Sequence, residues 1–155
     1  MPKQSAGILL YKRTAVGLRV LLVHPGGPFW AARDLGAWTV PKGEIAPGEE
    51  PLAAARREFA EETGSTAAGT PIPLPSIRQA GGKQVTAWAV EGEFDVATLR
   101  SNTFEVEWPP RSGRVASFPE VDRAQWFSLE EAARRILPSQ QPLLSALREA
   151  TSSST

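Results

Sequence analysis

The segment GEIAPGEEPLAAARREFAEETG, which runs from Gly43 to Gly64, carries the strongest structural signal in this chain. Its second half, Leu52–Thr63, is rich in good helix formers and contains no internal glycine or proline. Pro51 suits the first helical turn, because the N–H that it lacks would be unpaired there anyway. Gly64 readily adopts the left-handed conformation that closes many helices. We therefore expect a loop over residues 41–50, followed by a helix of about three turns or slightly more.

Acidic side chains gather on one face of this helix. Glu58, Glu61 and Glu62 follow the i, i+3, i+4 spacing, which places them within an arc of about 100°. Carboxylates this close repel one another, and hard divalent cations such as Mg²⁺ and Mn²⁺, which prefer oxygen ligands, would neutralise them. Arg57 can reach back toward Glu49 and hold that carboxylate in position. The alternative is a solvated acidic helix face, which is commoner for glutamate clusters taken alone.

The spacing of these residues matches a family pattern. The pattern is Gly-x5-Glu-x7-Arg-Glu-U-x-Glu-Glu-x-Gly-U, with U aliphatic or aromatic, and the chain follows it from Gly43 to Gly64. Only the last position departs, because Ser65 stands where an apolar residue is usual. The chain therefore resembles a Nudix hydrolase. That resemblance implies an α/β fold in which a mixed β-sheet lies between α-helices, with one domain over residues 1–150 and a polar tail over 151–155.

The resemblance also implies roles for the residues of the motif. The Gly43 carbonyl, Glu58 and Glu62 would hold Mg²⁺, for which Mn²⁺ could substitute, and Glu61 would be a further ligand or the general base. Members of the family differ in which carboxylate is the base, and some use a glutamate outside the motif. Glu120 is the candidate here, both as base and as metal ligand.

The case for Glu120 rests on its place in the sequence. It lies six residues before Trp126 in FPEVDRAQWF, a spacing that resembles the outlying glutamate of several family members. An ordinary loop carboxylate is an equally weighted alternative. Asp122 is a weaker competitor for the same role.

The expected function is that of a Mg²⁺-dependent pyrophosphohydrolase. It would cleave a nucleoside diphosphate linked to another moiety, by attack of a metal-activated water on phosphorus. The lead-in GAWTVPKGE at 36–44 resembles the bis(5′-nucleosyl)-tetraphosphatase side of the family, which favours dinucleoside polyphosphates or nucleoside triphosphates. Ala80–Gly82 stands where ADP-ribose hydrolases carry a marker proline and many diadenosine polyphosphate hydrolases a tyrosine, so neither marker is present.

A non-catalytic nucleotide sensor is the alternative function, and intact Glu58, Glu61 and Glu62 argue against it. Composition alone supports a third reading, an interaction module using EWPPRSGR.

Several residues outside the motif are candidates for substrate binding. Arg111 and Arg114 could grip phosphates bidentately, and Lys42 could contact another. Trp108 and Trp30 could stack on a base. The competing interpretation for each is a solvated loop cation or a tryptophan that covers the edge of the core.

Composition narrows the class of partner. Lysine plus arginine number 17, as do aspartate plus glutamate, so the formal net charge is zero. A duplex nucleic-acid binder usually shows a basic excess, and we expect a small nucleotide as the partner instead. The absence of cysteine is compatible with the cytoplasm, and neither a signal peptide nor a membrane span is visible. The family resemblance makes a homodimer possible.

The rest of the chain reads as strands followed by helices. In the first part of the chain we expect a hairpin over Ser5–Tyr11 and Leu18–Val23, a short strand at Trp38–Val40, and strands over Ile72–Gln79 and Gln84–Phe94 joined at Gly81–Gly82. An irregular stretch, Asp95–Pro119, and a strand, Ala124–Phe127, should follow. We expect two helices at the end, one from a capping box of Ser128 and Glu131 to Pro138 and one over Gln140–Ala150. His24, the lone histidine, is expected to be structural, and Trp88 and Trp126 to lie in the core.

Overall fold

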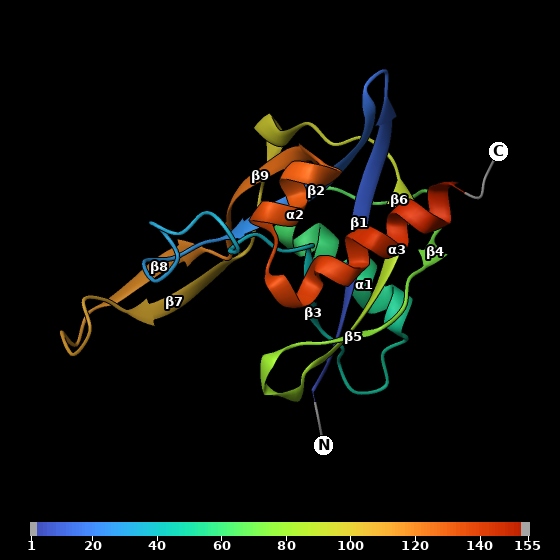
Figure 1. Cartoon of the computed structure of the whole chain (residues 1–155). Helices are drawn as coiled ribbons and strands as arrows, with labels where there is room; N and C mark the ends of the chain where they lie inside the picture. Colours follow the sequence, from blue (N-terminus) through green and yellow to red (C-terminus); the bar gives the residue numbers. More distant parts are fainter. Residues whose placement is uncertain (1–2, 153–155) are drawn as a thin grey trace.

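A mixed β-sheet forms the centre of the molecule, in a computed structural model that describes residues 3–152 (Figure 1). Its central strand is β1 (Gln4–Thr14), which pairs parallel with β6 (Gln84–Glu91) and antiparallel with β2 (Gly17–Pro25). Beyond β2 lies β9 (Val121–Ser128), and beyond β6 lies β4 (Ile72–Pro73). The run of apolar residues in β1 is buried on both faces, as a central strand requires.

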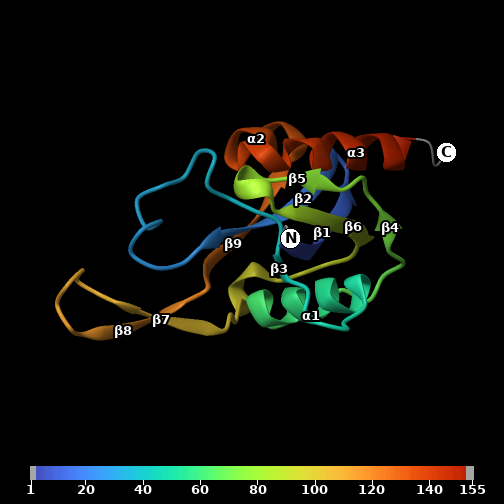
Figure 2. The same ribbon diagram turned by 90° about the horizontal axis from the view of Figure 1, so that it is seen from below.

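Helices cover both faces of this sheet (Figure 2). On one face, α1 (Pro51–Thr63) buries Phe59 in a cluster with apolar residues of β1 and β2. On the other face, α2 (Leu129–Arg135) and α3 (Gln141–Ser152) pack on a second apolar cluster that includes Trp38. The predicted arrangement of a mixed sheet between helices is therefore confirmed.

The caps expected at Gly64 and Ser128 are present, and Glu50 adds a cap that was not predicted. The Glu50 carboxylate accepts a hydrogen bond of 2.9 Å from the backbone N–H of Ala53, so it caps the start of α1 beside Pro51. Gly64 ends the helix with φ of 80°. Ser128 caps α2 by accepting from the backbone N–H of Glu131 at 3.1 Å. These contacts fix the two helix starts that the sequence predicted.

The remaining regular elements are short. They are β3 (Lys42–Glu44), β5 (Ile77–Arg78), β7 (Thr103–Glu107), β8 (Val115–Pro119) and the 3-10 turns η1 (Ala80–Gly82), η2 (Val96–Thr98) and η3 (Pro138–Gln140). Of these, β3 pairs with β1 and β5 with β6. The predicted polar tail began at residue 151, whereas α3 continues through Ser152 and residues 153–155 lie outside the described part.

The prediction that Asp95–Pro119 is irregular was wrong. Strands β7 and β8 form a separate antiparallel hairpin, which projects from the body of the molecule (Figure 1). Phe104 pairs with Phe118 across it, on a face that is half-buried. The alternation of apolar and polar residues is only five residues long in each strand and covers no deep core, which weakens the sequence signal.

Other strand boundaries also differ from expectation. The single strand expected at Ile72–Gln79 is two separate two-residue strands, because prolines within it cannot donate to a ladder. Trp38–Val40 makes only isolated bridges, from Trp38 to Ile136 and from Thr39 to Val23. The strand there is β3, which occupies part of the predicted loop over residues 41–50. In the described part of the chain, no helix is long and apolar enough to cross a membrane.

Candidate active site

Arg57 is the centre of a network on the exposed side of α1. Its Nε and Nη2 atoms donate to the two carboxylate oxygens of Glu49, at 2.8 and 3.0 Å. This forked pair fixes the loop before α1, and Nη2 also donates to the carbonyl of Glu44 at 3.1 Å. The hydrogen bonds from Arg57, followed by one from the backbone N–H of Ala46, lower the pKa of Glu49 to about 2. The structure thus pairs Arg57 with Glu49 as the sequence predicted.

The same guanidinium reaches two more carboxylates, a feature that the sequence did not predict. Nη1 of Arg57 donates to Glu58 at 2.7 Å and to Glu61 at 3.0 Å. Arg57 therefore neutralises part of the acidic face and orients three glutamates at once. An arginine that serves several carboxylates in this way is pre-organised by its planar fork of N–H donors.

Glu58 packs directly on Gly43 of β3. A Cβ atom added to Gly43 would fall on the Glu58 carboxylate, so only glycine fits at this point of the motif. Burial raises the pKa of Glu58, with the hydrogen bond from Arg57 opposing the rise and the charge of Glu61 adding to it. The Gly43 backbone and the desolvated Glu58 carboxylate thus lie in contact, and their role as metal ligands stays a prediction.

Glu62 lies on the inner side of the cluster. One carboxylate oxygen accepts from the backbone N–H of Lys42 at 3.3 Å. Burial, and then the nearby charge of Glu58, raise the pKa of Glu62 to about 8. Burial, together with the charge of Lys83, lowers the pKa of the Lys42 ammonium. The inner part of the site is therefore short of positive charge.

Glu120 approaches the cluster from the start of β9. The backbone N–H of Glu120 donates to the carbonyl of Asn102, and the N–H of Asn102 donates to the carbonyl of Glu61, both at 2.8 Å. Burial, and then the charge of Glu61, raise the pKa of Glu120. Asp122, the competing residue, is instead bonded to His24. The outlying glutamate thus lies beside the acidic helix face.

The carboxylates at α1 do not form a complete set of metal ligands. In residues 3–152, no three histidine or acidic side chains are grouped closely enough to hold a metal ion as they stand. The reason is that Arg57 draws Glu58 and Glu61 toward itself while Glu62 bonds to the Lys42 amide. The cluster still suits a hard cation, because two of its carboxylates are desolvated beside each other and share too little positive charge.

The predicted substrate-binding residues fall into two groups. Arg111 and Arg114 are exposed in the loop that joins β7 to β8, at the end of the hairpin remote from α1 (Figures 1 and 2). Trp108 packs edge-on against Phe29, with ring centroids 5.5 Å apart. Trp30 stands below the Arg33 guanidinium at 5.4 Å. The sequence had suggested Trp108 and Trp30, but it missed Phe29, although Pro-Phe-Trp in a glycine-rich loop was a visible signal.

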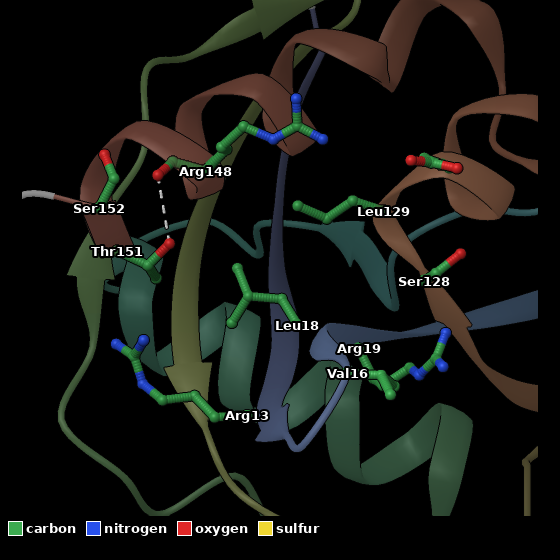
Figure 3. A pocket seen from close by; sticks show the side chains of 10 residues that line it. Arg13, Val16, Leu18, Arg19, Ser128, Leu129, Arg148, Thr151 and Ser152 are labelled. Carbon is green, nitrogen blue, oxygen red and sulfur yellow. Dashed lines mark hydrogen bonds between the residues drawn. The ribbon is translucent and has the colours of Figure 1, made fainter.

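His24 is buried as expected, but Trp88 and Trp126 lie at the edge of the core and not within it. His24 is fully buried, whereas Trp88 and Trp126 are half-buried against the α1-side cluster. A pocket of about 520 Å³ lies elsewhere, where Leu18 and Leu129 face each other beneath arginines such as Arg148 (Figure 3). None of the predicted site residues lines this pocket, and we place the site at α1 on chemical grounds.

Comparison with known proteins agrees with this geometry. A NUDIX domain family model matches residues 1–147. An RNA pyrophosphohydrolase of Brucella anthropi is 33% identical over 152 residues, which cover 81% of this chain and 81% of that protein. An RNA pyrophosphohydrolase of Rhodospirillum rubrum is 28% identical over 154 residues, with 92% of this chain and 87% of that protein covered.

Solved structures show the same fold at lower sequence identity. An Ap4A hydrolase of C. elegans, solved as a binary complex, has a TM-score of 0.69 at 23% identity and covers 97% of this chain and 98% of its own. The NUDIX domain of Shewanella oneidensis NrtR, complexed with ADP ribose, has a TM-score of 0.68 at 18% identity. The match covers 97% of this chain and 89% of that one.

The fold and the acidic helix together define a Nudix-type hydrolase. The family model spans nearly the whole chain, and a relative above 30% identity matches most of it. The chain belongs to the NUDIX family. It is a pyrophosphohydrolase that acts on phosphoanhydride bonds, as the recognition from the sequence had predicted.

Proposed function

We propose that this pyrophosphohydrolase is Mg²⁺-dependent and cleaves the 5′-polyphosphate of a nucleotide, with the triphosphate end of single-stranded RNA as its first candidate substrate. The carboxylate cluster ordered by Arg57 carries the proposal, because it supplies oxygen ligands without enough positive charge to balance them. The named activity of the relatives from Brucella anthropi and Rhodospirillum rubrum supports the choice of RNA. Dinucleoside polyphosphates and nucleoside triphosphates, favoured by the lead-in sequence, are the competing substrates.

The metal would be held by the Gly43 carbonyl, Glu58 and Glu62, with Glu61 and Glu120 as further ligands. A bound divalent cation would supply charge neutralisation on the phosphoryl oxygens and lower the pKa of a coordinated water. Mn²⁺ shares the preference for oxygen ligands and would substitute for Mg²⁺.

The protein's own residues would divide the remaining work. Arg57 and Glu49 hold the loop and the helix in register, so they position the carboxylates and do not touch the substrate. Glu61 and Glu120 compete for the role of general base, and burial, which raises the pKa of Glu120, makes that carboxylate a stronger proton acceptor than an ordinary glutamate. Lys42 lies beside the cluster and would contact a phosphate.

The aromatic residues near the hairpin would bind the nucleotide. Trp30 and Trp108, with their partners Arg33 and Phe29, offer ring and guanidinium surfaces on which bases stack. Arg111 and Arg114 lie farther out, so they would meet backbone phosphates beyond the reacting end. This division fits a substrate longer than a single nucleotide.

We expect the protein to act in the cytoplasm. Whether it forms a homodimer is to be tested by sedimentation.

A substrate panel in water labelled with heavy oxygen tests the proposal. Triphosphorylated RNA, nucleoside triphosphates and diadenosine tetraphosphate are incubated with Mg²⁺ or Mn²⁺, and product masses report which phosphorus was attacked. Glu61→Gln and Glu120→Gln are compared, and the larger loss of kcat, with binding retained, marks the base. If the unmutated protein hydrolyses none of these with either metal but binds nucleotides, it is a sensor and the proposal fails.

A further inference from the structure

The pocket of about 520 Å³ lies on the face of the sheet opposite to α1, where the turn between β1 and β2 meets the last part of α3 (Figures 2 and 3). Arg13 and Leu18 are register partners on the two strands, so their side chains lie on the same face of the sheet. Leu129 of α2 and Thr151 of α3 add the other walls. Segments far apart in the sequence therefore enclose this pocket, and it is separate from the carboxylates at α1.

The floor of the pocket is apolar. Leu18 and Leu129 are only partly buried, and both pack on the apolar cluster beneath α2 and α3. Val16, in the turn at the mouth of the pocket, is 78% exposed. A second hollow of about 240 Å³ continues between α2 and α3, shares Leu129 with the first, and adds Ala133 and Leu144. This apolar surface is larger than an inorganic anion needs, and it suits the ring system of an organic ligand.

Three arginines surround this floor (Figure 3). Arg148 of α3 and Arg13 of β1 lie on either side of Leu18, and Arg19 lines the end nearest to β9. Among residues 3–152, neither Arg148 nor Arg19 has an ion-pair partner. Arg13 lies 3.6 Å from Glu91, but both side chains are about half-exposed, and a pair of this kind is weak. These guanidinium groups can therefore bind a ligand.

The charge of the lining favours an anionic ligand. Glu130 is the one acidic residue among the described residues of the wall, against three arginines, in a chain whose formal net charge is zero. A guanidinium group binds phosphate oxygens through two parallel N–H donors. Positive charge around an apolar floor therefore suits a ligand that joins phosphate groups to a flat ring system.

We propose that this pocket is a second ligand site, which binds a free nucleotide with two or more phosphates. The base would lie on Leu18 and Leu129, and the phosphates between Arg13 and Arg148. Because arginines and not carboxylates predominate in the lining, binding here would need no divalent cation. The site does not depend on the proposed reaction, whose metal would be held at α1.

Nuclear magnetic resonance with ADP in the presence of a chelator tests the location of the site. Backbone amides in residues 13–19, 128–130 and 148–152 should shift, and those in residues 57–62 should shift less. Shifts confined to α1 and residues 26–36 would place ADP in the active site and overturn the inference. The absence of any shift up to about 1 mM ADP would overturn it too, because that concentration reaches even weak ligands.

Pyrophosphate and adenosine separate the two halves of the ligand. ADP should bind at least about tenfold more tightly than either, because only ADP uses both the arginines and the apolar floor. If pyrophosphate binds as tightly as ADP, the floor takes no part. If adenosine does, the arginines take no part. Either result contradicts a nucleotide site.

Substitutions of exposed residues test the charges without disturbing the core. Arg148→Gln should weaken ADP binding about tenfold, because it removes a charged phosphate ligand. Glu130→Gln should strengthen it about twofold, because it removes a nearby like charge. Arg78→Gln is the matched control, since Arg78 is exposed on β5 and does not line the pocket. Unchanged affinity in Arg148→Gln, or an equal loss in Arg78→Gln, would contradict the proposal.

The outcomes also separate this site from the proposed function. If no substrate is hydrolysed with Mg²⁺ or Mn²⁺, the proposed function fails, and ADP binding with a chelator still decides whether the second site exists. If hydrolysis is found but ADP leaves the amides of the pocket unshifted, only the second site is refuted.

Discussion

Glu62→Gln should make the metal-free protein more stable at alkaline pH. Burial and Glu58 raise the pKa of Glu62 from its usual 4.5 to about 8. Between these two values the unfolded chain ionises while the folded protein keeps its proton, so stability falls as pH rises. Below 4.5 both states are neutral and nothing is lost. The variant lacks this penalty, so its advantage should appear above pH 5 and be complete above pH 8.

The size of the effect follows from the shift. A change from 4.5 to about 8 corresponds to at most about 5 kcal/mol. Solvent near the half-buried side chain reduces this, and we expect about 2–3 kcal/mol at pH 9. For a chain of this length, that is a rise in Tm of roughly 4–12 °C. The glutamine can still accept from the Lys42 amide.

Thermal unfolding with a chelator at pH 5 and pH 9 measures the difference. Glu149→Gln is the matched control, because that glutamate is exposed on α3, on the other side of the sheet. Adding Mg²⁺ at pH 9 should stabilise the unmutated protein more than Glu62→Gln, because the variant lacks one of the proposed ligands. A variant that is equally stable or less stable than the unmutated protein at pH 9 would refute the reasoning.

Other substitutions test the remaining parts of the site and the core. Arg57→Lys should lower kcat/KM by about 10–100-fold, because an ammonium cannot make the forked pair with Glu49; unchanged kinetics would contradict this. Gly43→Ala should weaken Mn²⁺ binding in calorimetry, because its Cβ would displace the Glu58 carboxylate, and an unaltered affinity would remove that explanation. Gln140→Leu should cost about 1–3 kcal/mol in urea unfolding, because it strands a buried backbone N–H. The activity of its folded fraction should persist, and a loss of activity alone would show that this residue acts at the site.

The sequence predicted the motif well because one continuous segment supplies it. Arg57 and Glu49 are only eight residues apart, and the loop that precedes α1 brings Glu49 to the arginine. The contact of Glu58 with Gly43 likewise follows from a short loop that returns to a helix. Arg57 also binds Glu58 and Glu61, and the pair with Glu61 follows the i, i+4 helical spacing, so it could have been predicted.

Long-range contacts explain what the sequence could not predict. His24 was correctly expected to be structural, but its partner Asp122 is 98 residues away and no local pattern points to it. Glu120 reaches the acidic helix through the backbone of Asn102, which belongs to a stretch without periodicity. The hairpin was missed for the same reason, since its short strands are stabilised by contacts with the loop that carries Phe29.

Among residues 3–152, strands β7 and β8 share no backbone ladder with the central sheet, since they pair only with each other. An insertion or deletion in this hairpin would therefore shift no register in the strands that support the catalytic helix. Evolution, or an engineer, can lengthen or trim the tip of the hairpin to suit another polyphosphate while α1 and its carboxylates stay in place.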